Sequence, residues 1–417
     1  MSFAAIGVNG SPLARRPVRR RQYRVWNGTL MKLLNTRWSL FAVFASVVAW
    51  GCGESTPTSP PPPPPPDPAV YSALDAGDGH SCGISARGTF CWGEGEAGQI
   101  GDGASTDRDA PTRLITASTL VTIAAGGEHS CAVATDARVL CWGNGAEGQV
   151  GNGGTQNWTT PVAVSGAISF SSVTAGDSHT CGIATSGETY CWGLGESGRL
   201  GHGNVASRLT PTLVLGGQLF TQVSAGEEHT CGITASGAGF CWGEGDDGRL
   251  GTGNTSDRLE PAAVVGGLSF VRISAGESHT CAVSDAGESY CWGAGADGRL
   301  GSGNTQTRQQ PFLVQGGIGW ASISAGSDHT CGVATDGSGY CWGAGTAGQL
   351  GIGNTLSRFE PALVSSVPDF SWIGAGGDHT CGFTTAGAAY CWGLGDDGRL
   401  GTGNTNTLLL PGTVIAG

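Results

Sequence analysis

Short runs of hydrophobic residues, broken by glycine and other turn residues, recur along residues 69–417. In residues 220–264, "FTQVSAG" ends at a glycine, "HTCGIT" and "GFCWG" flank the turn "ASGA", and "PAAVV" follows a polar loop. Runs of this length between turn residues are typical of β-strands, and proline confines the last strand to a beginning or an edge position. No stretch keeps helical periodicity over three turns. The pattern predicts units of about four short strands.

The unit occurs seven times, with a period of 50 residues after one step of 49 at the start. Its markers are His80, His129, His179, His229, His279, His329 and His379; Trp92, Trp142, Trp192, Trp242, Trp292, Trp342 and Trp392; and Pro111, Pro161, Pro211, Pro261, Pro311, Pro361 and Pro411.

Four short strands are too few to bury their own faces, so neighbouring units must share them. A closed ring leaves no exposed end, whereas an open stack needs atypical capping repeats, and neither end shows one. The sequence therefore predicts an all-β fold, a seven-bladed β-propeller of about 50-residue four-stranded repeats over residues 69–417. If both ends meet, strands from both could complete one blade, and the sequence does not identify that strand.

The stretch "AGEEHTCGITASGAGFCWGEGDDGRLGTGN" (225–254) resembles the regulator-of-chromosome-condensation repeat. Its A-G-x-x-H-T, W-G and G-x-L/V/I-G-x-G elements recur in register seven times, with Ser for Thr in the first two copies. The resemblance covers residues 69–417 and implies a seven-bladed propeller. Family members include a nucleotide-exchange factor, an ultraviolet-B receptor and a secreted β-lactamase inhibitor. The predicted export and acidity of this chain, argued below, disfavour the role of nucleotide-exchange factor. The role of ultraviolet-B receptor is disfavoured because Glu227 and Glu228 stand where that receptor has its sensing tryptophans.

Each unit also contains a G-x-G-x-x-G pattern, such as Gly243, Gly245 and Gly248. A dinucleotide site needs a helix after this turn, whose N-terminus holds the pyrophosphate. The following "RLGTGNT" does not favour a helix, because glycine and asparagine break it. We therefore expect tight turns and close blade-to-blade approach, and no bound cofactor.

Fourteen of the 15 cysteines form pairs within units. The pairs are Cys82–Cys91, Cys131–Cys141, Cys181–Cys191, Cys231–Cys241, Cys281–Cys291, Cys331–Cys341 and Cys381–Cys391. Pairing residue 184 with residue 188 around a three-residue turn sets Cys181 opposite Cys191, within disulfide range. We expect seven disulfides; metal ligation with the adjacent histidine and free buried thiols are the alternatives.

Residues 1–52 are predicted to be an N-terminal extension and a lipoprotein-type signal peptide. Lys32 and Arg37 precede a mostly apolar run, 38–51, which is short for a membrane span, and Cys52 follows as the candidate lipid acceptor. Cleavage after Ala49 with simple secretion, and an uncleaved anchor, are the alternatives. The arginine-rich residues 1–30 are interpreted as a gene-model extension before Met31, or as a twin-arginine-like leader. Residues 53–68 are predicted to form a stiff Pro-rich linker.

No nucleophile elbow, HExxH motif or P-loop occurs, so the sequence predicts no catalytic residue and no metal site. Seven equivalent histidines favour a structural role, in which a half-buried imidazole bonds a neighbouring turn. The eighth, His202, is expected to lie solvated in a loop. The "DDG" at 246–248 and 396–398 lacks the spaced oxygen ligands of a calcium loop.

From Gly53 onward the chain has 13 arginines, no lysine and all 33 acidic residues, a formal charge of −20. Such a charge repels nucleic acids and anionic lipids, so contact with a membrane is expected only through a lipid anchor. Acids concentrate in two variable loop sets, before the histidine and inside the glycine motif, which favours a basic partner or serves solubility alone. One candidate partner-binding residue is Trp158, which is expected in a loop where the other units lack an aromatic residue. The others are the acidic residues Glu227, Glu228, Glu244, Asp246, Asp247, Asp396 and Asp397.

These features predict a monomeric, non-catalytic protein-binding scaffold, lipid-anchored in the bacterial cell envelope or secreted. One alternative is a polysaccharide- or peptide-acting enzyme, which needs two rim carboxylates at working separation, one with a raised pKa. The other is a structural envelope protein.

Overall fold

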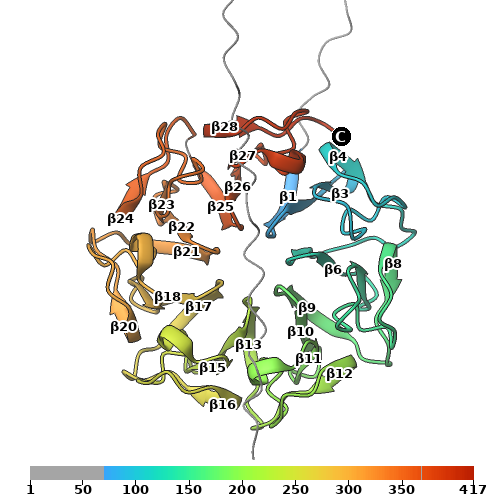
Figure 1. Ribbon diagram of the computed structural model, residues 1–417, viewed down its shortest axis with the longest axis horizontal. Coiled ribbons are helices and arrows are strands. Elements are labelled where there is room, and N and C mark those ends of the chain that lie inside the picture. Colours follow the sequence, from blue (N-terminus) through green and yellow to red (C-terminus); the bar gives the residue numbers. More distant parts are fainter. Residues whose placement is uncertain (1–69, 368) are drawn as a thin grey trace, which may run out of the picture. The chain divides into compact units, whose positions relative to one another are not determined.

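Each predicted unit forms one four-stranded antiparallel sheet in the computed structural model, which describes residues 70–367 and 369–417. The seven sheets surround a central axis (Figure 1). Strand order follows chain order within every sheet, and the proline of each unit lies in the outermost strand, where no further strand needs its missing N–H. The predicted seven-bladed β-propeller is therefore confirmed.

The first four blades, from the centre outward, are β1 (Tyr71–Ala76), β2 (His80–Ser85), β3 (Gly88–Gly93) and β4 (Arg108–Arg113); β5 (Ala124–Ala125), β6 (His129–Val133), β7 (Val139–Gly143) and β8 (Trp158–Ala163); β9 (Phe170–Ala175), β10 (His179–Ala184), β11 (Thr189–Gly193) and β12 (Arg208–Leu213); and β13 (Phe220–Ala225), β14 (His229–Thr234), β15 (Gly239–Gly243) and β16 (Arg258–Ala263).

The last three blades are β17 (Phe270–Ala275), β18 (His279–Ser284), β19 (Ser289–Gly293) and β20 (Arg308–Leu313); β21 (Trp320–Ala325), β22 (His329–Ala334), β23 (Gly339–Gly343) and β24 (Arg358–Leu363); and β25 (Phe370–Ala375), β26 (His379–Thr384), β27 (Ala389–Gly393) and β28 (Leu408–Thr413).

A disulfide joins the two middle strands of every blade, with the predicted pairs. In the third blade Cys181 lies directly opposite Cys191, and the Ala184 amide donates to the Glu188 carbonyl, which is the predicted register. The paired Cα atoms are 4.1 Å apart, as in a non-hydrogen-bonded antiparallel pair. In each pair the two sulfurs are bonded to each other, which agrees with the predicted disulfides rather than with the two alternatives.

The hydrophobic core lies between blades rather than within them. Trp292 of the fifth blade is fully buried and packs against Leu250 and Ile233, which belong to the fourth unit. The equivalent tryptophans of all seven units are fully buried. A single unit therefore cannot complete its own core, as expected for four short strands.

The ring closes through contacts between the first and last blades. The Gly377 amide donates to the Gly77 carbonyl at 3.2 Å, and Trp92 Nε1 donates to the Arg399 carbonyl at 3.0 Å. Each of these blades already contains four consecutive strands, and Val70 adds only an isolated bridge to Ala388. The expectation that strands from both ends complete one blade is therefore wrong, because unit boundaries coincide with blade boundaries.

The glycine motif forms a compact turn. Gly243 and Gly248 have φ of 104° and 77°, which only glycine adopts easily. A methyl group on Gly248 would lie 2.5 Å from Gln309 Cα in the next blade, which confirms the expected close approach. In four units the motif ends in a short 3₁₀ turn that includes its third glycine: η1 (Glu196–Gly198), η2 (Asp246–Gly248), η3 (Ala296–Gly298) and η4 (Asp396–Gly398). The helix that a dinucleotide site requires is absent from residues 70–367 and 369–417.

The predicted signal peptide (1–52), the lipid acceptor Cys52 and the linker (53–68) lie outside the described residues and stay predictions. Within the part of the chain that the structure describes, no helix has the length and hydrophobicity to cross a membrane.

Candidate functional site

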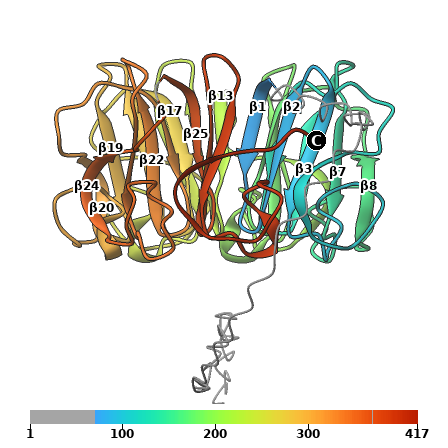
Figure 2. The ribbon, with the colours of Figure 1, turned by 90° about the horizontal axis from the view of Figure 1, so that it is seen from above.

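The chain crosses the ring four times per blade, so its connections alternate between two faces. The loop face carries the turns between first and second strands, such as 77–79, and the long loops between third and fourth strands, such as 94–107. The hairpin face carries the disulfide-bonded hairpins, such as 85–88, and the connections between blades, such as 114–119 (Figure 2). Both predicted variable loop sets therefore lie on the loop face.

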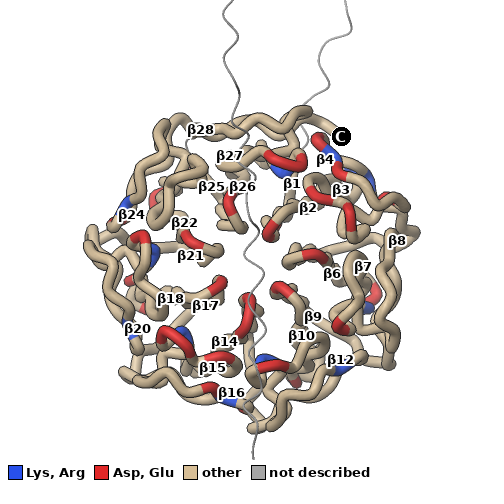
Figure 3. The backbone as a smooth tube through the Cα atoms, in the orientation of Figure 1, with Lys and Arg blue, Asp and Glu red and all other residues tan. Residues whose placement is uncertain are grey.

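Each unit has an Ala-Gly pair directly after its first strand, and the seven turns that they begin meet around the axis on the loop face. The pairs are at 76–77, 125–126, 175–176, 225–226, 275–276, 325–326 and 375–376. The amide after each glycine donates to the carbonyl of the equivalent glycine in the next blade. The seven hydrogen bonds have N···O distances of 3.1–3.3 Å and form a closed circle around the axis. The turns surround a central cavity of about 150 Å³ whose carboxylates are Asp78, Asp177, Glu227 and Glu277. We call this the axial mouth; acidic positions gather there and in the outer loops (Figure 3).

The axial mouth disfavours negative charge. Burial, followed by the charges of Glu277 and Asp177, raises the pKa of Glu227 to about 8. Burial also raises the pKa of Asp177 and of Glu277. Glu227 therefore carries a proton for most of the time at neutral pH.

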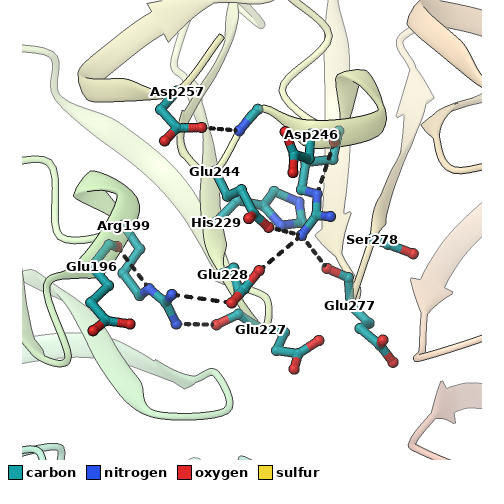
Figure 4. Close-up of polar contacts among 12 residues, drawn as sticks. Glu196, Arg199, Glu227, Glu228, His229, Glu244, Asp246, Asp257, Glu277 and Ser278 are labelled. Atoms are coloured by element: carbon teal, nitrogen blue, oxygen red, sulfur yellow. Dashed lines mark hydrogen bonds and ion pairs between the residues drawn. The ribbon is translucent and has the colours of Figure 1, made fainter. Parts of the chain in front are cut away.

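Two buried arginines, Arg199 and Arg249, hold Glu228 and Glu244 (Figure 4). Arg249 Nη1 lies 2.7 Å from Glu244 Oε2 and 3.6 Å from Glu228 Oε2. Arg199 Nη2 lies 3.6 Å from Glu228 Oε1, and Arg199 Nη1 donates to the Glu227 carbonyl at 2.9 Å. Glu228 thus lies between two guanidinium groups from neighbouring units.

Glu228 and Glu244 are also hydrogen-bonded to each other, so they titrate differently. The bond from Glu244, together with Arg199 and Arg249, lowers the pKa of Glu228. Burial and the bond to Glu228 raise the pKa of Glu244 to about 8. Near neutral pH the two carboxyl groups therefore share one proton.

The same arrangement recurs in two other blades. Arg399 Nη2 lies 2.8 Å from Asp397 Oδ2, and Arg399 Nη1 donates to the Asp78 carbonyl at 3.2 Å. Arg299 pairs with Asp328. Sequence reasoning missed these arginines. One sequence feature could have revealed them. The residue before Leu-Gly, Ile-Gly or Val-Gly is glutamine in three units and arginine in the other four, at Arg199, Arg249, Arg299 and Arg399.

Three predicted candidates have their side chains in solvent: Asp246, Asp247 and Asp396 are exposed. Asp247 has φ of 59°, in the left-handed region that aspartate and asparagine tolerate best among non-glycine residues. Together with half-buried Asp397, these acids stand in the 3₁₀ turns of the outer loops. The structure therefore separates accessible outer acids from the internally paired Glu228 and Glu244.

Trp158 was expected in a loop, and this expectation is wrong. It is the first residue of strand β8, lies opposite Gly143, and is half-buried against hydrophobic clusters on both sides of its blade. In every unit the outer strand begins at this position, and the sequence did not predict that the strand begins so early. A role for Trp158 in partner contact is not tested by this placement.

The recurring histidines are fully buried, not half-buried, and each bonds a hydroxyl of the next blade rather than a turn. His129 Nε2 lies 2.8 Å from Thr180 Oγ1, which donates its own proton to the Gln149 carbonyl. His129 must therefore donate from Nε2. Burial lowers its pKa to about 4, so the ring is neutral near pH 7. The equivalent bond from His379 to Ser81 completes the ring, so the structural role is confirmed.

His202 was expected to be solvated, and this is also wrong. The residue is 7% exposed and Nε2 lies 2.9 Å from the Thr212 carbonyl oxygen, because the loop folds back on strand β12. Burial lowers its pKa to about 4. Across residues 70–367 and 369–417, no three His, Cys, Asp or Glu side chains are grouped so that they could hold a metal ion.

The RCC1-like domain family model matches residues 88–415. Human WBSCR16 is 20% identical, with a TM-score of 0.72 over 78% of this chain and 93% of that chain. Prp20p from Saccharomyces cerevisiae, described with its binding to Gsp1p and histones, is 22% identical, with a TM-score of 0.71 over 84% and 88%. The ectodomain of the Physcomitrella patens receptor kinase CR4 is 22% identical, with a TM-score of 0.52 over 78% and 74%. At these identities the solved structures establish the fold alone.

Proposed function

Because the chain belongs to the RCC1-like domain family, we propose that it is a non-catalytic scaffold that binds another protein through its loop face. The repeated histidines, threonines and tryptophans are buried and form hydrogen bonds between neighbouring blades. The loops of the loop face differ between units and are accessible to a partner. Rigid repeat scaffolds commonly recognise partners with such loops.

The observation that carries this proposal is the placement of accessible acids. Asp246, Asp247 and Asp396 are exposed on the loop face, outside the internal pairs of Arg249 and Arg399. An acidic face that is not neutralised from within attracts a basic segment and raises its association rate. The partner is therefore proposed to present lysines or arginines to the outer loops.

We propose that the protein is exported, as a lipid-anchored or secreted bacterial envelope protein that acts as a monomer. Seven disulfides support this, because such bonds persist in oxidising compartments. Val70 enters the ring beside Ala388, next to a hairpin on the hairpin face.

Family relatives support binding over catalysis. The yeast relative Prp20p was described with its binding to Gsp1p and histones, and the moss relative is the ectodomain of a receptor. Neither partner is transferred to this chain, because the identities are 22%.

Capture from the native envelope tests the proposal. The full-length protein is compared with a loop-face variant, D246N/D247N/D396N/D397N, in which asparagine also suits the left-handed backbone at 247 and 397. The matched control, E188Q/D285N/E288Q/D336N, removes four exposed acids from the hairpin face. We expect one stoichiometric partner, at least tenfold weaker binding for the loop-face variant, and no change for the control.

Equal capture by all three proteins contradicts a loop-face site. Capture of no protein by any of them favours the structural envelope role.

The hydrogen-bonded carboxyl pair favours the enzyme alternative, because one acid in it has a raised pKa. Against a glycosidase-like role, the two groups contact each other, whereas such enzymes hold a substrate between carboxyl groups about 5 Å or more apart. Release of products from polysaccharides or peptides, lost in E244Q but kept in E188Q, would establish this alternative.

A further inference from the structure

The inner strand of the second blade differs from the other inner strands. β5 has two residues, Ala124–Ala125, whereas each of the other six has six. Just before it, the Val133 amide donates to the Thr122 hydroxyl oxygen at 3.2 Å. A threonine side chain competes here with the backbone for a hydrogen bond of the sheet. Residues 120–125 are therefore paired less regularly with their own blade than the equivalent residues elsewhere.

Most inner strands are also bonded sideways to the inner strand of the next blade. Ser224 Oγ accepts a hydrogen bond from the Ala275 amide at 3.0 Å. Equivalent bonds join Thr174 to Ala225, Ser274 to Ala325 and Ser324 to Ala375. The second and seventh blades have Ala124 and Gly374 at this position, whose side chains offer no oxygen. Of these two inner strands only β5 is short, so it is weakly held both by its own blade and by the next one.

A carboxylate holds β5 from the side of the first blade. Asp75 stands at the position of these serines, and it is the only acid there in the seven units. Its Oδ2 accepts a hydrogen bond from the Ala125 amide at 2.9 Å, and its Oδ1 accepts one from the Ala76 amide at 3.1 Å. Bonds to a charged acceptor are strong, but removing a carboxylate from water costs free energy. The attachment of Ala125 to the first blade therefore depends on the charge of Asp75.

We propose that residues 120–125 open locally from the ring, and that the protonation of Asp75 controls how often they open. A strand with few regular backbone bonds is the kind of unit that opens without global unfolding. The segment leads directly into Gly126 and Gly127, which line the axial mouth. Its opening therefore loosens one side of that mouth. The proposal does not depend on the loop-face partner.

The direction of the pH effect follows from the burial of Asp75. Burial raises its pKa to about 6, against the opposite effect of the two amide bonds. When the segment opens, water reaches the carboxyl group and its pKa returns toward the ordinary value of 3.8. The protonated form therefore favours the closed segment, and this stabilisation is lost as pH rises through about 6.

The titratable groups around Asp75 do not change their charge in this range. Burial raises the pKa of Tyr71 to about 12 and lowers the pKa of His80 to about 3, of His129 to about 4 and of His379 well below its usual value. Apart from disulfide-bonded cysteines, these are the titratable side chains of β2, β6, β26 and the rest of β1, and β5 and β25 have none. Between pH 5 and 7 only Asp75 titrates at this place.

Hydrogen–deuterium exchange of the full-length, oxidised protein, expressed as protection factors, tests the proposal by comparing residues 120–126 with residues 270–276. The second segment is a matched reference, because the Ala275 amide also donates to a side-chain oxygen but β17 has six residues. At pH 7 we expect at least tenfold lower protection in 120–126. Lowering the pH from 7 to 5 should raise its protection about tenfold relative to 270–276, since one unit of pKa difference corresponds to a factor of ten.

Two variants assign the response to Asp75. D75S supplies the hydroxyl that three other units have at this position, and should remove the pH response of residues 120–126. The control D136S removes an exposed carboxylate from the same blade and should keep the response. Equal protection of the two segments in the unchanged protein, no response to pH, or a response kept in D75S overturns the proposal. The first two outcomes need only the unchanged protein.

Discussion

At the scale of single residues, each repeated side chain is defined by its partner in the next blade. Thr180 accepts a hydrogen bond from His129 and donates one to the Gln149 carbonyl, and Trp192 donates to the same carbonyl. The sequence revealed that these residues repeat, and repetition correctly predicted a structural role. It did not reveal their burial or their partners, because both depend on how neighbouring blades meet.

The buried histidines should make folding sensitive to acid. Their pKa values are lowered in the folded state, so the unfolded chain binds protons first as pH falls below 6.5. For His129 the stabilisation present above pH 6.5 is lost as pH falls toward about 4, at about 1.4 kcal/mol per pH unit. In H129Q a donor at the end of the side chain remains, but nothing titrates.

We therefore expect the free energy of unfolding of H129Q to depend less on pH than that of the unchanged protein, by about 1.4 kcal/mol per unit between pH 6 and 5. Denaturant unfolding at several pH values measures this. An identical slope in both proteins would show that His129 is already protonated when folded, or does not donate as described.

The acidic candidates mark the limit of prediction at this scale. The sequence identified Glu228, Glu244 and Asp397 as variable acids, yet arginines of the same ring hold all three. Arg249 is 21 residues away from Glu228 along the chain, and the two meet because the turn before the histidine and the glycine-motif loop emerge on one face. Side-chain pairing of this kind follows from the fold and not from local spacing.

At the scale of elements, the hairpin was the most predictable part of the molecule. Cysteine spacing and a three-residue turn specify the register, and Cys231 lies opposite Cys241 as they require. Strand ends were less predictable, as Trp158 shows, because a half-buried outer strand has no strong hydrophobic alternation.

Each disulfide closes a short loop and should stabilise its blade. In the chain-entropy model a loop of about ten residues contributes about 3 kcal/mol. We expect C231V/C241V, which keeps apolar side chains at two fully buried positions, to fold with an unfolding free energy lower by about 2–3 kcal/mol. Guanidinium unfolding measures the difference.

The corresponding control is the unchanged protein under reducing conditions. Because both sulfurs are fully buried, native protein should resist a mild reductant that converts the denatured protein completely. Free thiols in the native protein before any treatment would contradict the assignment of the pairs.

At the scale of the whole molecule, the period and the number of units predicted the ring, because sheets of this size must share faces. What the sequence could not supply was the manner of closure. A circle of amide-to-carbonyl bonds at the axis links all seven blades, including the last to the first. Closure by shared contacts needs no exchanged strand.

The axial circle should tolerate no side chain at its glycines. A methyl group on Gly226 would lie 2.3 Å from the Gly276 carbonyl oxygen, a backbone atom that cannot move alone. We expect G226A to lower the free energy of unfolding by more than about 2 kcal/mol, as overpacking in a rigid core does. In the control G154A, the added methyl group meets only the end of the flexible Gln156 side chain, and a change below about 1 kcal/mol is expected.

The central claim, that partners bind at the loop face, is tested most directly by hydrogen–deuterium exchange of the full-length protein with and without its captured partner. The account predicts slower exchange in loop-face segments such as 244–257 and 394–407, and unchanged exchange in hairpins such as 234–239. Protection confined to the hairpins would contradict it.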